Sequence, residues 1–106
     1  MATNLTIEGA PFACVRLAEA DFADVAAVYV VICVASGGSW KALDVGQSGS
    51  VGSRIDAHDR KDCWRRNCPS GNIWVCVHRM PSSSKQQREE LERSLRRSLN
   101  PPCGDR

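Results

Sequence analysis

The sequence lacks any apolar run long enough to cross a membrane. Its longest such run extends from Val25 to Ala35, about half the length that a spanning helix needs. No basic and apolar leader with a small-residue cleavage site opens the chain. We therefore expect no membrane contact and a cytoplasmic location, and we interpret the apolar run as a buried strand.

Internal repeats and low-complexity tracts are also absent from the chain. Its 106 residues leave room for one compact domain. The hydrophobic fraction of 42% and the charged fraction of 25% are ordinary for a globular protein. We expect a single domain in which residues 27–106 form the functional unit and residues 1–26 pack on it as an N-terminal extension.

Charge is distributed unevenly along the chain. The net charge is only +2, but residues 51–106 carry twelve basic and seven acidic side chains, while residues 1–50 carry two and five. Clustered Lys and Arg neutralise phosphates and release condensed counterions. The basic second half therefore favours nucleic acid as a partner.

Six cysteines admit several interpretations. Two of them lie inside apolar, strand-like runs and no export signal accompanies them, so we expect free buried thiols. A zinc site is an alternative, with Cys63 and Cys68 as its first ligands, but the Cys-x4-Cys spacing is looser than the usual Cys-x2-Cys. The remaining ligands of such a site would come from His58, Cys76, His78 or Cys103.

Local patterns predict a β-hairpin near the middle of the chain. Residues 28–34 are almost all β-branched or aromatic, residues 36–39 read Ser-Gly-Gly-Ser, and residues 40–45 form a second strand that Gly46 ends. A short helix is expected from Ser48 onward, and a loop over residues 60–72.

The last third predicts one more strand and a helix. Residues 72–79 alternate in polarity as a strand does. After Pro81 three serines offer helix caps, and leucines recur every four residues before Pro101. The order β-β-α-β-α indicates an α+β fold, with helices on a mixed or antiparallel sheet of about three strands.

Several short motifs resemble those of the GIY-YIG nuclease superfamily. Ala27-Val28-Tyr29 is similar to the first signature, and Asp44-Val45-Gly46 stands where the second would fall. Arg54 and His58, four residues apart on one helix face, resemble the R-x-x-x-H pattern of restriction-type members. Glu92, with Leu95 and Pro101 after it, is similar to the last motif.

Helix geometry independently favours this glutamate. At 100° per residue, Glu92 falls about 20° beyond the edge of the stripe formed by Leu91, Leu95 and Leu99, whereas Glu89 and Glu90 point well away from it. Glu92 is therefore the glutamate that can face the sheet.

The resemblance implies a metal-dependent endonuclease that cleaves phosphodiester bonds of DNA rather than RNA. Glu92 would bind a single Mg²⁺ or Mn²⁺, in preference to zinc, and Arg54 would brace the phosphate. Tyr29 would position or deprotonate the attacking water, with His58 as a neighbour able to take the tyrosine proton. Gly46, Gln47 and Ser48 would approach the nucleic acid beside Arg54.

The chain departs from the family pattern at three positions. Ala27 replaces the first glycine, Asp44 replaces the second tyrosine, and Gly104 stands at the usual terminal asparagine. Asp44 could join Glu92 on the metal or accept a proton from water, and we include it among the catalytic candidates. Two alternatives stay open: a non-catalytic nucleic-acid-binding module of the same fold, and a small zinc-stabilised interaction domain. A monomer is the expected state.

Overall fold

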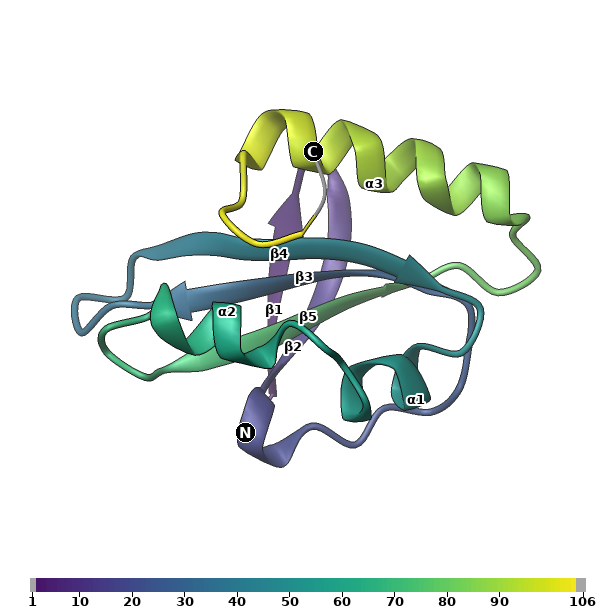
Figure 1. Cartoon of the computed structure of the whole chain (residues 1–106). Helices are drawn as coiled ribbons and strands as arrows, with labels where there is room; N and C mark the ends of the chain where they lie inside the picture. Colours follow the sequence, from purple (N-terminus) through teal and green to yellow (C-terminus); the bar gives the residue numbers. More distant parts are fainter. Residues whose placement is uncertain (1, 105–106) are drawn as a thin grey trace.

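The computed structural model describes residues 2–104 and has five strands and three α-helices in an α+β fold. The expected α+β class is confirmed, but the sheet has five strands instead of three. The strands are β1 (Ala2–Ile7), β2 (Ala10–Arg16), β3 (Ala27–Val34), β4 (Trp40–Ser48) and β5 (Ile73–Arg79). All neighbouring strands are antiparallel, in the order β1-β2-β5-β3-β4 (Figure 1).

The two additional strands come from the start of the chain. β1 and β2 form a hairpin through Glu8 and Gly9, both with positive φ, which is the backbone that a two-residue hairpin turn requires. β2 then pairs with β5 and so extends the central sheet. A short 3₁₀ helix, η1 (Leu17–Glu19), and a loop lead from this hairpin to β3.

The central hairpin forms where the sequence predicts it, with one correction. β3 is buried along almost its whole length, as expected for an apolar run covered on both faces. β4 does not stop at Gly46 but continues to Ser48, because residues 46–48 stay paired with β3 as far as Ala27. β4 is one of the two edge strands of the sheet, and β1 is the other.

Two short helices, α1 (Val51–Asp56) and α2 (Lys61–Arg66), follow β4. α2 lies where a loop was expected, and its single buried residue, Trp64, fixes it to the sheet. Asp24, in the loop before β3, accepts hydrogen bonds from the backbone N–H and the hydroxyl of Ser53. This contact ties the N-terminal region to the start of α1.

The long helix α3 (Lys85–Leu99) is the element that the sequence predicts best. Ser84 is its N-cap in a reciprocal capping box with Gln87. Asn100 ends the helix in the left-handed conformation, directly before Pro101. No helix within residues 2–104 is long and apolar enough to span a bilayer.

The sheet separates two apolar layers. One face of β3, with Tyr29 and Val31, packs under α1 and α2, and the other, with Val28 and Val30, packs against Leu95 of α3. In Figure 1, α3 lies along β4 on one side, and α1 and α2 lie on the other. Residues close to β4 are therefore within reach of all three helices.

All six cysteines are paired, so the expectation of free thiols is wrong. Cys14 and Cys76 face each other across β2 and β5, Cys33 of β3 is bonded to Cys68 after α2, and Cys63 of α2 is bonded to Cys103. Disulfide sulfurs are not available as thiolate ligands, which removes the cysteine-based zinc site.

Candidate functional site

Tyr29 of β3 meets His58, which lies beyond the end of α1 and not on the helix face that the sequence predicts for it together with Arg54. The Tyr29 hydroxyl lies 2.7 Å from His58 Nε2, and the two rings pack edge to face. Gly46 is the β4 partner of Tyr29, and a Cβ at Gly46 would overlap the Tyr29 hydroxyl and ring. Only glycine leaves room for the Tyr29 ring at this position. Tyr29, Gly46 and His58, from three segments far apart in the sequence, are therefore in close contact.

The proton of neutral His58 can be assigned from its second nitrogen. The backbone N–H of Arg60 donates to His58 Nδ1 at 3.1 Å, so Nδ1 is an acceptor. The proton of the neutral imidazole is then on Nε2 and is donated to the Tyr29 oxygen. The Tyr29 hydroxyl proton is left for another acceptor. This geometry favours Tyr29 as a hydrogen-bond donor over transfer of its proton to His58.

Burial controls the protonation of this pair. It raises the pKa of Tyr29 to about 12, against the opposing effect of the Arg54 guanidinium. Burial also lowers the pKa of His58 to about 4, and the charges of Arg54 and Arg60 act in the same direction. At neutral pH both rings are therefore uncharged.

Stability should depend on pH through His58. Its folded pKa of about 4 lies below the ordinary value of 6.5, so the unfolded chain takes up this proton first as the pH falls. The stability contributed by neutral His58 is complete above pH 6.5 and is lost as the pH falls through about 4. We expect lowering the pH from 7 to 4 to cost the parent about 3 kcal/mol more than His58→Gln.

Urea unfolding of the two proteins at both pH values measures this difference. His78→Gln is the matched control, because it removes the other histidine. An identical pH dependence in the parent and His58→Gln would contradict the assignment of His58 as a buried neutral base.

Arg54 reaches solvent beside the buried pair. Its side chain is 33% exposed and makes an ion pair of 3.2 Å with Asp59, which is itself 75% exposed. An ion pair this open contributes little to stability and is easily exchanged. The Arg54 guanidinium is therefore available to an anion from solution while it stays close enough to lower the pKa of Tyr29.

Asp44 is fully buried, and both of its carboxylate oxygens are occupied. Oδ2 accepts from Arg60 Nε at 2.7 Å and from Trp64 Nε1 at 2.8 Å. Oδ1 accepts from Arg96 Nη2 and from the Val45 backbone N–H, both at 2.8 Å, and from Arg60 Nη2 at 3.2 Å. These contacts connect β4 to α2 and α3 and leave no free lone pair for a metal or a proton.

The C-terminal segment packs against the ion pair between Asp44 and Arg96. Gly104 has a φ of +94°, and a Cβ there would overlap the Arg96 guanidinium and press on Asp44. Arg96 Nη1 donates to the Cys103 carbonyl at 3.1 Å, and Arg96 also donates to the Val45 carbonyl. Glycine at position 104 is thus required by close packing against the Asp44 cluster.

Glu92 lies one helical turn before Arg96 on the same side of α3. Its side chain is 26% exposed, and its Oε2 is 3.6 Å from Arg96 Nε. Burial raises the pKa of Glu92, while the charges of Arg96 and Arg60 oppose this effect. Glu92 is therefore more enclosed than Glu90, as the helix geometry predicts, but Glu89 is also half-buried, so the geometry does not single out Glu92. Through Arg96, Glu92 belongs to the same electrostatic group as Asp44.

No group of three or more His, Cys, Asp or Glu side chains within residues 2–104 is arranged to hold a metal ion. Mg²⁺ is often bound by one or two carboxylates and completes its shell with water and phosphate oxygens. Glu92 fits such a single-carboxylate site, because its side chain is partly exposed and its ion pair with Arg96 is long, at 3.6 Å. Asp44 does not fit, because its oxygens are filled.

Gln47 and Ser48 end β4 beside Gly46. The Gln47 side-chain oxygen accepts from Nε of Arg88, a buried arginine of α3, at 3.0 Å. Ser48 Oγ accepts from the Ser50 backbone N–H at 2.9 Å, just before α1. Both side chains therefore help to hold the end of β4 to the flanking helices.

Two arginines of the site were not singled out from the sequence. Arg60 connects the two halves of the site, because its charge acts on the pKa of Tyr29, His58 and Glu92. Arg96 connects Glu92 to Asp44. The one sequence signal for these two arginines is Asp44, because an aspartate buried on a strand requires cationic partners.

Comparison with protein-family models, curated proteins and solved structures found no match to this chain.

Proposed function

We propose that this chain is a divalent-metal-dependent endonuclease that hydrolyses phosphodiester bonds of DNA. The observation that carries the proposal is the fitted contact of Tyr29, His58 and Gly46, with the solvent-accessible Arg54 beside it. The chain order of β3, β4, two short helices, β5 and α3 also agrees with the GIY-YIG resemblance of the motifs. Glu92 supplies the carboxylate for the metal.

Each residue has a distinct role in this proposal. Arg54 binds the phosphate and stabilises the negative charge that develops on it. His58 donates from Nε2 to the Tyr29 oxygen and so directs the remaining hydroxyl proton of Tyr29 toward water or a phosphate oxygen. A Mg²⁺ or Mn²⁺ ion on Glu92 would polarise the phosphate and lower the pKa of bound water.

Asp44 acts as a positioning residue in this proposal. With five donors on its two oxygens, it holds Arg60 and Arg96 in fixed directions. Arg60 in turn presents its backbone N–H to His58. The residue that replaces the second tyrosine of the family pattern thus sets the geometry around the reacting groups.

Nicking of supercoiled plasmid in Mg²⁺ or Mn²⁺ tests the proposal. We expect the parent to produce nicked circles, and Arg54→Gln and Glu92→Gln to cut at least about 100-fold more slowly. Glu90→Gln is the matched control, since it removes an exposed glutamate of the same helix. Equal rates for all four proteins would indicate a contaminating nuclease and refute the assignment.

A non-catalytic nucleic-acid-binding module is the second candidate. It is favoured by the burial of Tyr29, which is only 1% exposed, and by the filled oxygens of Asp44. DNA binding without any nicking in either metal would establish this candidate. Three disulfides favour an oxidising compartment. They weigh against the cytoplasmic location that the sequence predicts.

A further inference from the structure

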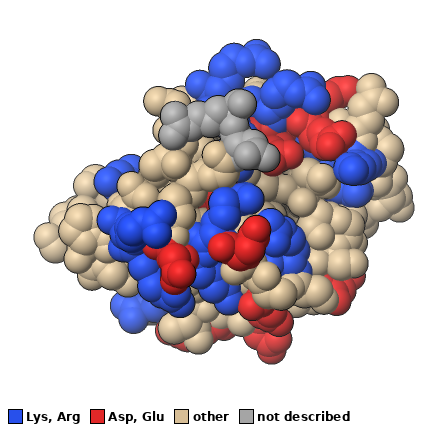
Figure 2. Space-filling view, in the orientation of Figure 1, with Lys and Arg blue, Asp and Glu red and all other residues tan. Residues whose placement is uncertain are grey.

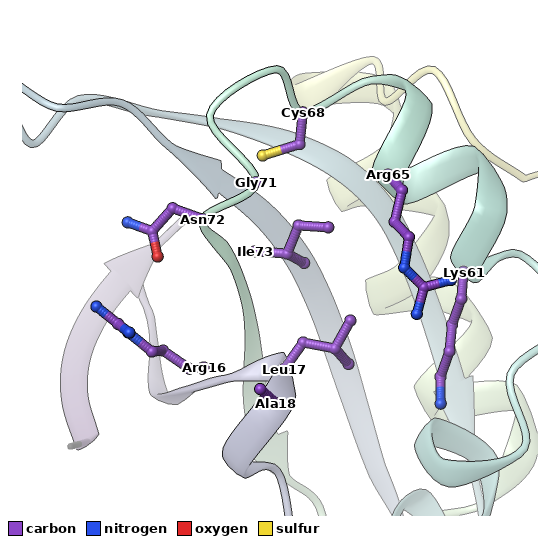
Figure 3. A pocket seen from close by; sticks show the side chains of 9 residues that line it. All are labelled: Arg16, Leu17, Ala18, Lys61, Arg65, Cys68, Gly71, Asn72 and Ile73. Atoms are coloured by element: carbon purple, nitrogen blue, oxygen red, sulfur yellow. The ribbon is translucent and has the colours of Figure 1, made fainter.

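A basic cavity of about 610 Å³ is lined in part by Lys61 and Arg65 of α2. It opens between the end of β2 with η1 and the helix α2, and Figure 3 shows the side chains that line it. The volume is within the range of small-molecule sites. No acidic side chain within residues 2–104 lines it.

Three cations line the cavity. Lys61 and Arg65 are four residues apart on α2 and extend along the same side of it (Figure 3). Arg16, at the end of β2, also lines the cavity, but its side chain extends away from α2 and its guanidinium lies over Trp74, 5.9 Å from the ring centroid. Arg65 is 61% exposed, and its ion pair with Asp62, which is 88% exposed, is long at 3.4 Å. Lys61 Nζ donates only to a backbone carbonyl, that of Asp56. Two of the charges are therefore not neutralised by a buried acid.

The middle of the cavity is apolar. Leu17 and Ile73 lie between the two basic sides in Figure 3. Both belong to the apolar layer under α1 and α2, in which Ile73 is 7% exposed. A ligand that fits has negative charge at its edge and a flat or apolar body, which is the chemistry of a nucleotide. Figure 2 shows Lys and Arg over α2 and along α3 on one face, with Asp and Glu side chains among them.

We propose that this cavity binds one nucleotide of a nucleic-acid strand, with its phosphates on Lys61 and Arg65 and its base against Leu17 and Ile73. The inference rests on the proposed action on nucleic acid and adds a subsite to it. Lys61 directly follows Arg60, whose side chain is bonded to Asp44. Adjacent residues of the chain therefore line the cavity and belong to the Asp44 cluster.

Fluorescence anisotropy with a labelled twelve-residue oligothymidylate tests the charges. EDTA is present, so that no cleavage occurs. We expect Lys61→Gln with Arg65→Gln to weaken binding about tenfold. The control is Arg66→Gln with Lys85→Gln, which removes the same charge from exposed positions outside the cavity. Equal losses in the two double variants would overturn the proposal.

The base contact has a separate readout that needs no variant. An oligomer of the same length with abasic sugars keeps every phosphate, and we expect the parent to bind it about tenfold more weakly. Leu17→Ser should lose this preference. Equal binding of the two oligomers by the parent would overturn the cavity assignment, even if plasmid is nicked. Loss of nicking with the preference intact would instead refute only the nuclease.

Discussion

Asp44→Ala is expected to lower the free energy of unfolding by about 3–5 kcal/mol, the usual cost of removing one partner from a buried charge cluster. The substitution leaves Arg60, Arg96 and the Trp64 indole without their shared acceptor. Arg96 is 15% exposed, so water replaces the lost carboxylate only in part. Because the cluster joins β4 to α2 and α3, both helices should loosen together.

Urea unfolding followed by tryptophan fluorescence measures this loss. Asp59→Ala is the matched control: it also removes a carboxylate from an arginine, but Asp59 is 75% exposed, and we expect a cost of no more than about 1 kcal/mol. Similar costs for the two variants would contradict the description of Asp44 as a buried centre of the fold.

Removing the Cys63–Cys103 disulfide should have a similar effect. The bond closes a loop across a sequence separation of 40 residues, for which the chain-entropy model gives about 4 kcal/mol. Cys63→Ser with Cys103→Ser should lower the free energy of unfolding by about that amount. The C-terminal segment should separate from β4, because the backbone of Cys103 is otherwise held by its N–H, which donates to the Leu43 carbonyl, and by its carbonyl, which accepts from Arg96.

The free energy of unfolding of both proteins, measured with and without a strong reductant, gives the contribution of the Cys63–Cys103 bond. Oxidised parent should be more stable than the double variant, and the difference should disappear once all disulfides of both proteins are reduced. Oxidised proteins of equal stability would show that the bond does not constrain the chain in solution.

The parts of the fold that could be predicted are those with strong local patterns. β3 is a β-branched run, the turn before β4 contains two glycines, and α3 has a serine N-cap and a terminal proline. The N-terminal hairpin lacks such a pattern, because its turn places Glu8 at positive φ, where Asn or Gly is the usual signal. α2 is a six-residue helix held by the buried Trp64 and by the Cys63–Cys103 bond, and local composition does not distinguish it from a loop.

The candidate site also contains residues that the sequence predicts and residues that only the fold reveals. Tyr29, Arg54, His58 and Glu92 belong to short motifs with recognisable spacing, and the structure brings Tyr29, His58 and Gly46 into contact. The positions of Arg60 and Arg96 depend on the burial of Asp44, which only the folded sheet determines. The cysteine pairing was hidden for a related reason: six cysteines allow 15 connectivities, and the Cys14–Cys76 bond requires β2 beside β5.

In the proposed nuclease, Tyr29 acts on the phosphodiester from within its buried contact with His58 and Gly46. DNA affinity and plasmid nicking measured on the same samples of parent and Tyr29→Phe test this role, because phenylalanine keeps the ring over Gly46 and removes only the hydroxyl. We expect unchanged affinity and nicking that is slower by about 100-fold or more. Equal nicking by the two proteins, or none by the parent, would rule this role out.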